Sequence, residues 1–185
     1  MFLLKQYPEY IFNFEGAVKY AWMKEYYPAQ YEEMKKFIES GRWHISGASW
    51  DATDTLVPSI ESAIRNIMLG QDYYRKEFGV ESTDIFLPDC FGFGWTLPAI
   101  ASHCGLIGFS SQKLQWRNKP FYGNDKYPFT VGLWQGIDGS TIMMTHGYDY
   151  NQRFEDGDLS ENKDLLELTG HSPLHMVYRY YGTGD

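Results

Sequence analysis

Cysteine is scarce in this sequence of 185 residues. Its two cysteines, Cys90 and Cys104, form no CxxC pair, so neither a disulfide framework nor a cysteine-rich zinc site is expected. The sequence also has no apolar run of about 18 residues. Its first ten residues lack the basic start and the long apolar stretch of a signal peptide. No membrane-spanning or secretory segment is therefore visible.

Positive charge is in short supply. The chain has 16 Lys and Arg against 24 Asp and Glu, a formal net charge of −8. It has no cluster of basic residues, so the electrostatic footprint of nucleic-acid binding is missing. Aromatic residues are abundant instead, with 15 Tyr, 12 Phe and 6 Trp. Aromatic rings exposed in a cleft can stack on sugars, so this content favours a carbohydrate-binding site. The competing interpretation is that the rings form a hydrophobic core rich in tyrosine.

Hydrophobic patterning predicts an α/β fold with parallel strands and crossover helices. Short apolar runs predict strands over 10–14, 43–46, 84–87, 106–109, 131–135, 141–145 and 176–181. Helical spacing predicts helices over 15–40 with a break at 26–28, over 59–78, up to Cys104, and over 162–168. The Asp138–Gly139 corner between two of the strands is typical of a hairpin.

In such folds the chemistry lies at the carboxyl ends of the strands. Asp89 follows a predicted strand and the stiff Pro88, which makes it a candidate nucleophile or metal ligand; the alternative is a helix-capping Asp. Asp185 follows the last predicted strand and is a second candidate carboxylate. The alternative is that it belongs to a simple turn. Two carboxylates at neighbouring strand ends suit acetal hydrolysis, in which one attacks and the other protonates the leaving oxygen.

Seven segments together carry a resemblance to a known family. In order they read YPEYIFNFEGAVKYAWMKEYYP, GRWHISGASWDATDTLVPSIESAIRNIMLGQDYYRKEFGV, FLPDCFGFGWTLPAI, SSQKLQW, FTVGLWQGIDGS, HGYDYN and YRYYGTGD. They resemble the catalytic domain of glycoside hydrolase family 38, the retaining α-mannosidases. The resemblance covers nearly the whole chain.

The resemblance implies a partial (β/α)7 barrel in which the first strand and the C-terminal strands are missing. Residues 1–185 would then be an incomplete N-terminal catalytic barrel domain. It also implies a zinc ion and a mannose-containing oligosaccharide or glycan as substrate. The implied roles are Asp89 as nucleophile and zinc ligand, Asp185 as acid/base, and Phe91, Lys113 and Tyr148 as substrate-binding residues.

The family pattern has zinc ligands that this sequence lacks. A His-x-Asp pair on the first strand and a later His are not found, so Asp89 is the one expected ligand that remains. The resemblance therefore implies an internal part of a longer enzyme, inactive by itself. Two alternatives stay open: a metal-dependent polysaccharide deacetylase, which an H-x3-H pair would support, and a non-catalytic remnant that binds carbohydrate through its aromatic residues.

Overall fold

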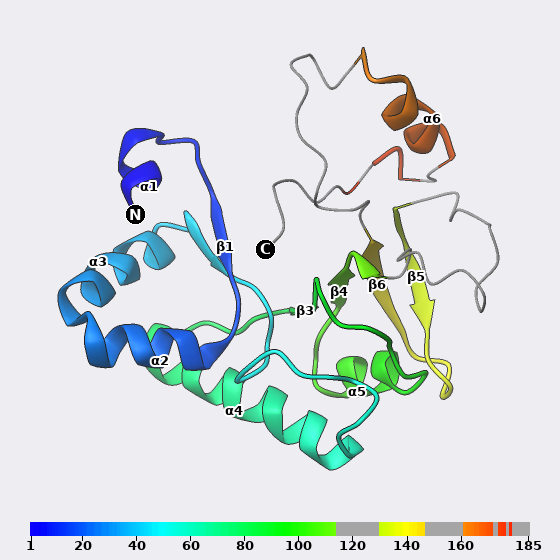
Figure 1. The fold of residues 1–185 in the computed structure, drawn as a ribbon, viewed down its shortest axis with the longest axis horizontal. Coiled ribbons are helices and arrows are strands. Elements are labelled where there is room, and N and C mark those ends of the chain that lie inside the picture. Colours follow the sequence, from blue (N-terminus) through cyan, green and yellow to red (C-terminus); the bar gives the residue numbers. More distant parts are fainter. Residues whose placement is uncertain (114–129, 147–160, 172–173, 177, 179–185) are drawn as a thin grey trace.

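The computed structural model describes residues 1–113, 130–146, 161–171, 174–176 and 178 (Figure 1). The first elements along the chain are α1 (Phe2–Gln6), β1 (Phe12–Phe14), α2 (Ala17–Tyr26), α3 (Pro28–Glu39) and β2 (Trp43–Ile45). They are followed by α4 (Ile60–Phe78), β3 (Asp84–Phe86), α5 (Leu97–His103), β4 (Gly108–Ser111), β5 (Val131–Gln135), β6 (Thr141–His146) and α6 (Lys163–His171). No helix among these is long and apolar enough to cross a membrane.

Local signals in the sequence set the ends of the longer helices. The predicted break lies between α2 and α3, where Pro28 occupies the first turn of α3, a position that needs no backbone N–H donor. At the start of α4, the Ser59 hydroxyl accepts a hydrogen bond from the Ser62 N–H. At its end, Gly79 has a φ of 69°, the left-handed conformation in which glycine commonly ends helices.

The described strands form two sheets. In the first, β1 pairs with β2 in parallel. In the second, the order is β3-β4-β6-β5, and every neighbouring pair is parallel except the β5–β6 hairpin. The predicted α/β class, with parallel strands and crossover helices, is confirmed. These two sheets do not by themselves establish the expected partial barrel.

The two sheets meet where the chain leaves β2. The Ala48 N–H donates to the Asp84 carbonyl at 2.8 Å, and the Ser46 hydroxyl donates to the Asp84 carboxylate at 2.6 Å. The Asp84 carboxylate also accepts from the Gly47 N–H at 3.2 Å. Hydrogen bonds around the first residue of β3 therefore fasten one sheet to the other.

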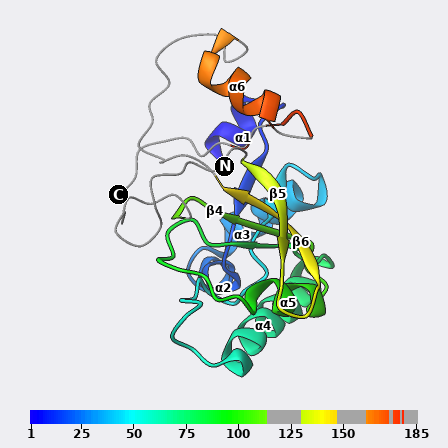
Figure 2. The ribbon, with the colours of Figure 1, turned by 90° about the vertical axis from the view of Figure 1, so that its right-hand side faces the viewer.

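Helix α4 joins two hydrophobic cores. Its Ile67 belongs to the core under the four-stranded sheet, together with Ile85 and Phe109. Its Tyr74 belongs to the core between α2, α3 and the β1–β2 pair. Figure 1 shows α4 running beneath both groups, and Figure 2 shows α4 and α5 on the same side of the four-stranded sheet. This helix fixes one half of the molecule against the other.

Three predicted strands differ from the structure. Strand β1 begins at Phe12, two residues after the predicted start. Pairing in β4 begins at Gly108, not at Leu106, because the Leu106 N–H bonds back to the Ala101 carbonyl at the end of α5. In the predicted strand over 176–181, the described residues Met176 and Tyr178 are not in a strand, and the rest lies outside the described residues. The short helix α1 was not predicted.

Candidate active site

Asp89 lies at the carboxyl end of a parallel strand, as predicted. The pairing of β3 with β4 continues past Phe86, since the Leu87 N–H donates to the Ser110 carbonyl at 2.9 Å. Pro88 then turns the chain, and the Asp89 side chain is half exposed. A carboxylate in this place is open to a ligand while its backbone is held by the sheet.

Lys113 lies next to Asp89 because β4 is the neighbour of β3. Its ammonium is 2.6 Å from the Asp89 Oδ1 atom, and its side chain is only 7% exposed against 50% for Asp89. The same ammonium lies 4.7 Å from the centre of the Phe91 ring. A buried cation thus orients an exposed carboxylate through a charge-assisted hydrogen bond. Three of the predicted site residues, Asp89, Phe91 and Lys113, are brought together.

A second loop holds the turn that carries Asp89. The Thr55 hydroxyl donates to the Gly92 carbonyl at 2.7 Å, and the Cys90 thiol donates to the Thr53 carbonyl at 3.1 Å. Burial, with smaller contributions from the charges of Asp54 and Asp89, raises the pKa of the Cys90 thiol. Sequence reasoning missed both threonines; the run of Asp and Thr in the loop after β2 was their only signal.

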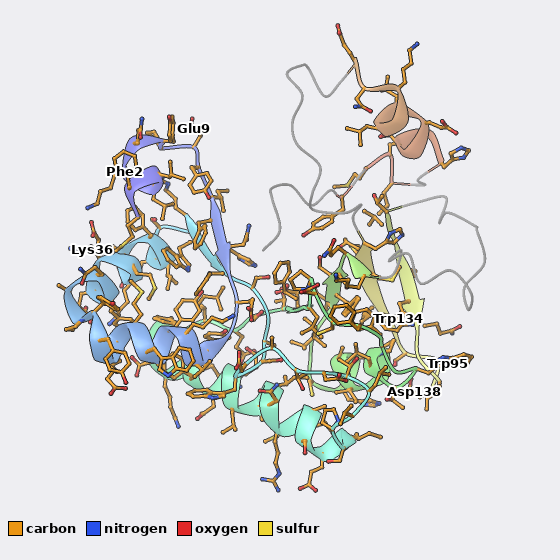
Figure 3. The ribbon with its side chains drawn as sticks, viewed as in Figure 1. Phe2, Glu9, Lys36, Trp95, Trp134 and Asp138 are labelled. Carbon is orange, nitrogen blue, oxygen red and sulfur yellow. The ribbon has the colours of Figure 1, made fainter. Side chains whose placement is uncertain are left out.

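Two predicted site residues, Asp185 and Tyr148, lie outside the described residues, as does Trp116. Two of the tryptophans that could have lined a sugar-binding cleft, Trp50 and Trp95, have different surroundings. Trp50 packs on Tyr73 of α4 with ring centres 5.8 Å apart. Trp95 is 82% exposed and lies at the outer edge of the molecule near the β5–β6 hairpin (Figure 3). Tertiary packing, which local sequence does not encode, separates these rings.

The described residues do not fit a zinc site by themselves. Within them, no group of three or more His, Cys, Asp or Glu side chains could hold a metal ion. Asp89, the one expected ligand, has the Lys113 ammonium against it. The H-x3-H spacing that would support the deacetylase alternative, which the sequence was first read as lacking, does occur once, at His171 and His175. Both side chains are exposed, at and just beyond the end of α6. No catalytic step is therefore derived through a metal.

Comparison with known proteins identifies the family. The family model described as "Glycosyl hydrolases family 38 N-terminal domain" matches residues 1–171. The chain belongs to glycosyl hydrolase family 38. It is 37% identical to "Alpha-mannosidase G" of Dictyostelium discoideum over 97% of this chain and 16% of that protein. The chain spans 13–16% of the length of the curated relatives it matches.

Solved structures agree on the fold of this family 38 chain. An alpha-mannosidase from Enterococcus faecalis V583 superposes with a TM-score of 0.62, at 21% identity, over 78% of this chain and 16% of that one. A 4-alpha-glucanotransferase from Thermococcus litoralis gives a TM-score of 0.71, at 15% identity, over 98% of this chain and 28% of that one. At these identities the likeness concerns the fold alone.

Proposed function

We propose that the protein hydrolyses terminal α-mannosidic linkages of mannose-containing glycans with retention of anomeric configuration. The observation that carries the proposal is the half-exposed Asp89 carboxylate at the end of β3, held by Lys113 at 2.6 Å. Membership of family 38 and the names of the relatives, which are alpha-mannosidases, support mannose as the sugar.

Asp89 is the nucleophile in this proposal. Its free oxygen forms a bond to the anomeric carbon while the bond from that carbon to the leaving oxygen breaks. Asp185 gives its proton to the leaving oxygen. Water then attacks the glycosyl-enzyme, Asp185 takes the proton from the water, and Asp89 leaves. Retention requires the two carboxyl groups to lie about 5–5.5 Å apart.

Lys113, Phe91 and Tyr148 complete the proposed site. The Lys113 ammonium fixes one Asp89 oxygen, which leaves the other to attack. The Phe91 ring is largely exposed beside the carboxylate, so that it can pack against the apolar face of a pyranose. Tyr148 is proposed as a further contact to the sugar. Lys113 is proposed as a substrate contact as well, since its ammonium lies against both Asp89 and the Phe91 ring.

We also propose that the chain forms part of a (β/α)7 barrel and that the protein uses zinc. A partial (β/α)7 barrel is supported by the hydrogen bonds that join β2 to β3 through Asp84. Zinc is proposed as the cofactor, with Asp89 as its one ligand among the described residues. The steps above name residues of this chain. Zinc, held by Asp89 together with further ligands of the longer protein, would supply positive charge that orients the sugar and the nucleophile.

Covalent trapping tests the proposal. A fluorinated, mannose-configured glycosyl donor that forms the glycosyl-enzyme quickly but releases it slowly should label the protein, expressed together with its flanking coding sequence. Peptide mass spectrometry should place the label on Asp89. Asp89→Asn should abolish labelling and turnover, whereas the control Asp72→Asn, in an exposed ion pair on α4, should retain both. Label on another carboxylate, or inversion seen by proton NMR, would contradict the mechanism.

A further inference from the structure

We propose that Thr55 is a positioning residue that sets the Asp89 turn, defined here as residues 88–92, for catalysis. This inference rests on the proposed role of Asp89. At Asp89 the turn is held by the ion pair with the Lys113 ammonium, which serves here as the first tether. Thr55 supplies a second tether three residues further on, where its hydroxyl donates to the Gly92 carbonyl at 2.7 Å.

The loop that carries Thr55 is itself fixed to α4. The Asp51 N–H donates to the Asn66 side chain at 3.1 Å, and the Asn66 amide donates to the Asp51 carbonyl at 2.8 Å. The Asp54 carboxylate accepts from the N–H groups of Leu56 and Val57 at 2.7 and 3.1 Å. These hydrogen bonds hold the loop in place between α4 and the Asp89 turn.

A cavity interrupts side-chain packing next to these hydrogen bonds. A cavity of about 40 Å³ lies between the loop, α4 and α5, and its lining includes Thr53, Thr55, Ile67, Leu87 and Ile100. Atoms that face a void lose dispersion contacts on that side. Contacts between loop and turn at the edge of this cavity include the hydrogen bonds of the Thr55 hydroxyl and the Cys90 thiol. They also include the Leu56 side chain, whose Cδ1 atom lies 2.5 Å from the position that a Cβ on Gly92 would take.

Removing the Thr55 hydroxyl should loosen the turn without unfolding the protein. Thr55→Val keeps the shape of the side chain but removes the donor to Gly92. Without this hydrogen bond, the Asp89 carboxylate also occupies positions from which it is not aligned with the anomeric carbon. Misplacement of a reacting group by about 1 Å can lower the rate about a hundredfold. The effect on kcat should exceed the effect on KM because, of the proposed sugar contacts, Phe91 lies on the turn, whereas Lys113 and Tyr148 lie outside it.

Cys90 reports the state of the turn independently of activity. The 185-residue chain has two cysteines, and both are partly buried. In the 185-residue chain, Thr55→Val should raise the rate of Cys90 modification by a disulfide reagent about tenfold, as expected for the loss of one hydrogen bond. Cys104 should keep its rate, Thr55→Ser should restore protection, and the control Thr83→Val, at the opposite end of β3, should change neither.

The outcomes separate this inference from the proposed function. An unchanged Cys90 rate in Thr55→Val, or an equal rise at both cysteines, overturns the positioning role. With flanking sequence present, Thr55→Val should lower kcat on an aryl α-mannoside at least about tenfold and change KM by a smaller factor. An unchanged kcat, or a rise in KM larger than the fall in kcat, also overturns it. Full activity of Asp89→Asn would instead overturn the proposed function, while the Cys90 result would still decide whether Thr55 holds the turn.

Discussion

Gln71 is the buried polar side chain that ties α4 to the segment leading into β3. It is 7% exposed, and its amide both donates to the Ser82 carbonyl at 2.7 Å and accepts from the Ser82 N–H at 3.0 Å. Gln71→Ala leaves two buried backbone groups without these partners, so we expect a loss of about 2–3 kcal/mol in the free energy of unfolding. Urea denaturation measures it. Gln30→Ala, at an exposed position of α3, should change stability by less than about 0.5 kcal/mol.

Glu77 makes the stability of the helical layer depend on pH. Its carboxylate accepts from the Lys24 ammonium at 2.7 Å and from the Tyr31 hydroxyl at 2.9 Å. The hydrogen bond from Lys24, more than any other contact, lowers the pKa of Glu77 below its ordinary value of 4.5. A lowered pKa in the folded state stabilises the protein above the unfolded pKa, and this contribution disappears as the pH falls through the folded value.

The measurement that checks this is the difference in Tm between the wild type and Glu77→Gln. It should be largest near neutral pH and shrink below about pH 4.5, where the carboxylate becomes protonated. Glu61→Gln is the control, because Glu61 pairs with Arg65 at a well-exposed position of the same helix and exposed pairs contribute little. A difference for Glu77→Gln that stays constant down to pH 3 would contradict the assignment.

The sequence predicted some of the individual site residues and not others. Asp89 could be predicted because a strand, a proline and two glycines surround it in the chain. Its contact with Lys113 was not predicted, because the family resemblance implied Lys113 only as a substrate-binding residue. The pairing of β3 with β4 brings the two side chains together. Thr55 and Gln71 could not be predicted, because a hydroxyl or an amide gains its role from a backbone group that lies far away in the sequence.

Helix α4 packs unusually close to the chain that leaves β2. Gly70 faces the backbone of residues 48–50, and a Cβ on it would overlap the Ala48 carbonyl and come within 2.7 Å of the Trp50 nitrogen. Backbone atoms cannot rotate away, so Gly70→Ala must displace the helix. We expect it to lower the free energy of unfolding by at least about 2 kcal/mol.

The matched control is Gly170→Ala in α6, where no atom of the described part of the chain lies within 4 Å of the added Cβ. This change should leave stability unchanged or raise it by up to about 1 kcal/mol, since alanine favours helix more than glycine does. Urea midpoints of the two variants measure the contrast. Similar midpoints for both would show that α4 does not depend on its close approach to the loop.

Helices and strands were predicted better than the site residues or the arrangement of the sheets. Capping and turn residues placed both ends of α4 and the β5–β6 hairpin within about a residue, because these signals act within one turn of chain. Strand β4 was placed two residues early, since the end of α5 uses Leu106 for a helix-terminal hydrogen bond. Such competition between two elements for one backbone group is decided by tertiary structure.

For the whole molecule, the alternation of elements predicted the α/β class but not the arrangement of its sheets. Strands β1, β2 and β3 have three residues each, so few hydrogen bonds fix how one sheet continues into the next. The junction depends on Asp84, whose carboxylate takes donors from Ser46 and Gly47. Nothing in the local sequence distinguishes this Asp from an ordinary residue at the start of a strand.

The last prediction concerns the 185-residue chain by itself. Its described residues give a zinc ion no group of three ligands, and Asp89 is already paired with Lys113. A catalytic charge must be preorganised to stabilise a transition state. We therefore expect the purified chain with added zinc to hydrolyse an aryl α-mannoside no faster than buffer, and to retain well below one zinc ion per chain on elemental analysis. Turnover that Asp89→Asn abolishes would show instead that residues 1–185 assemble a working site, with Lys113 rather than a metal holding the nucleophile.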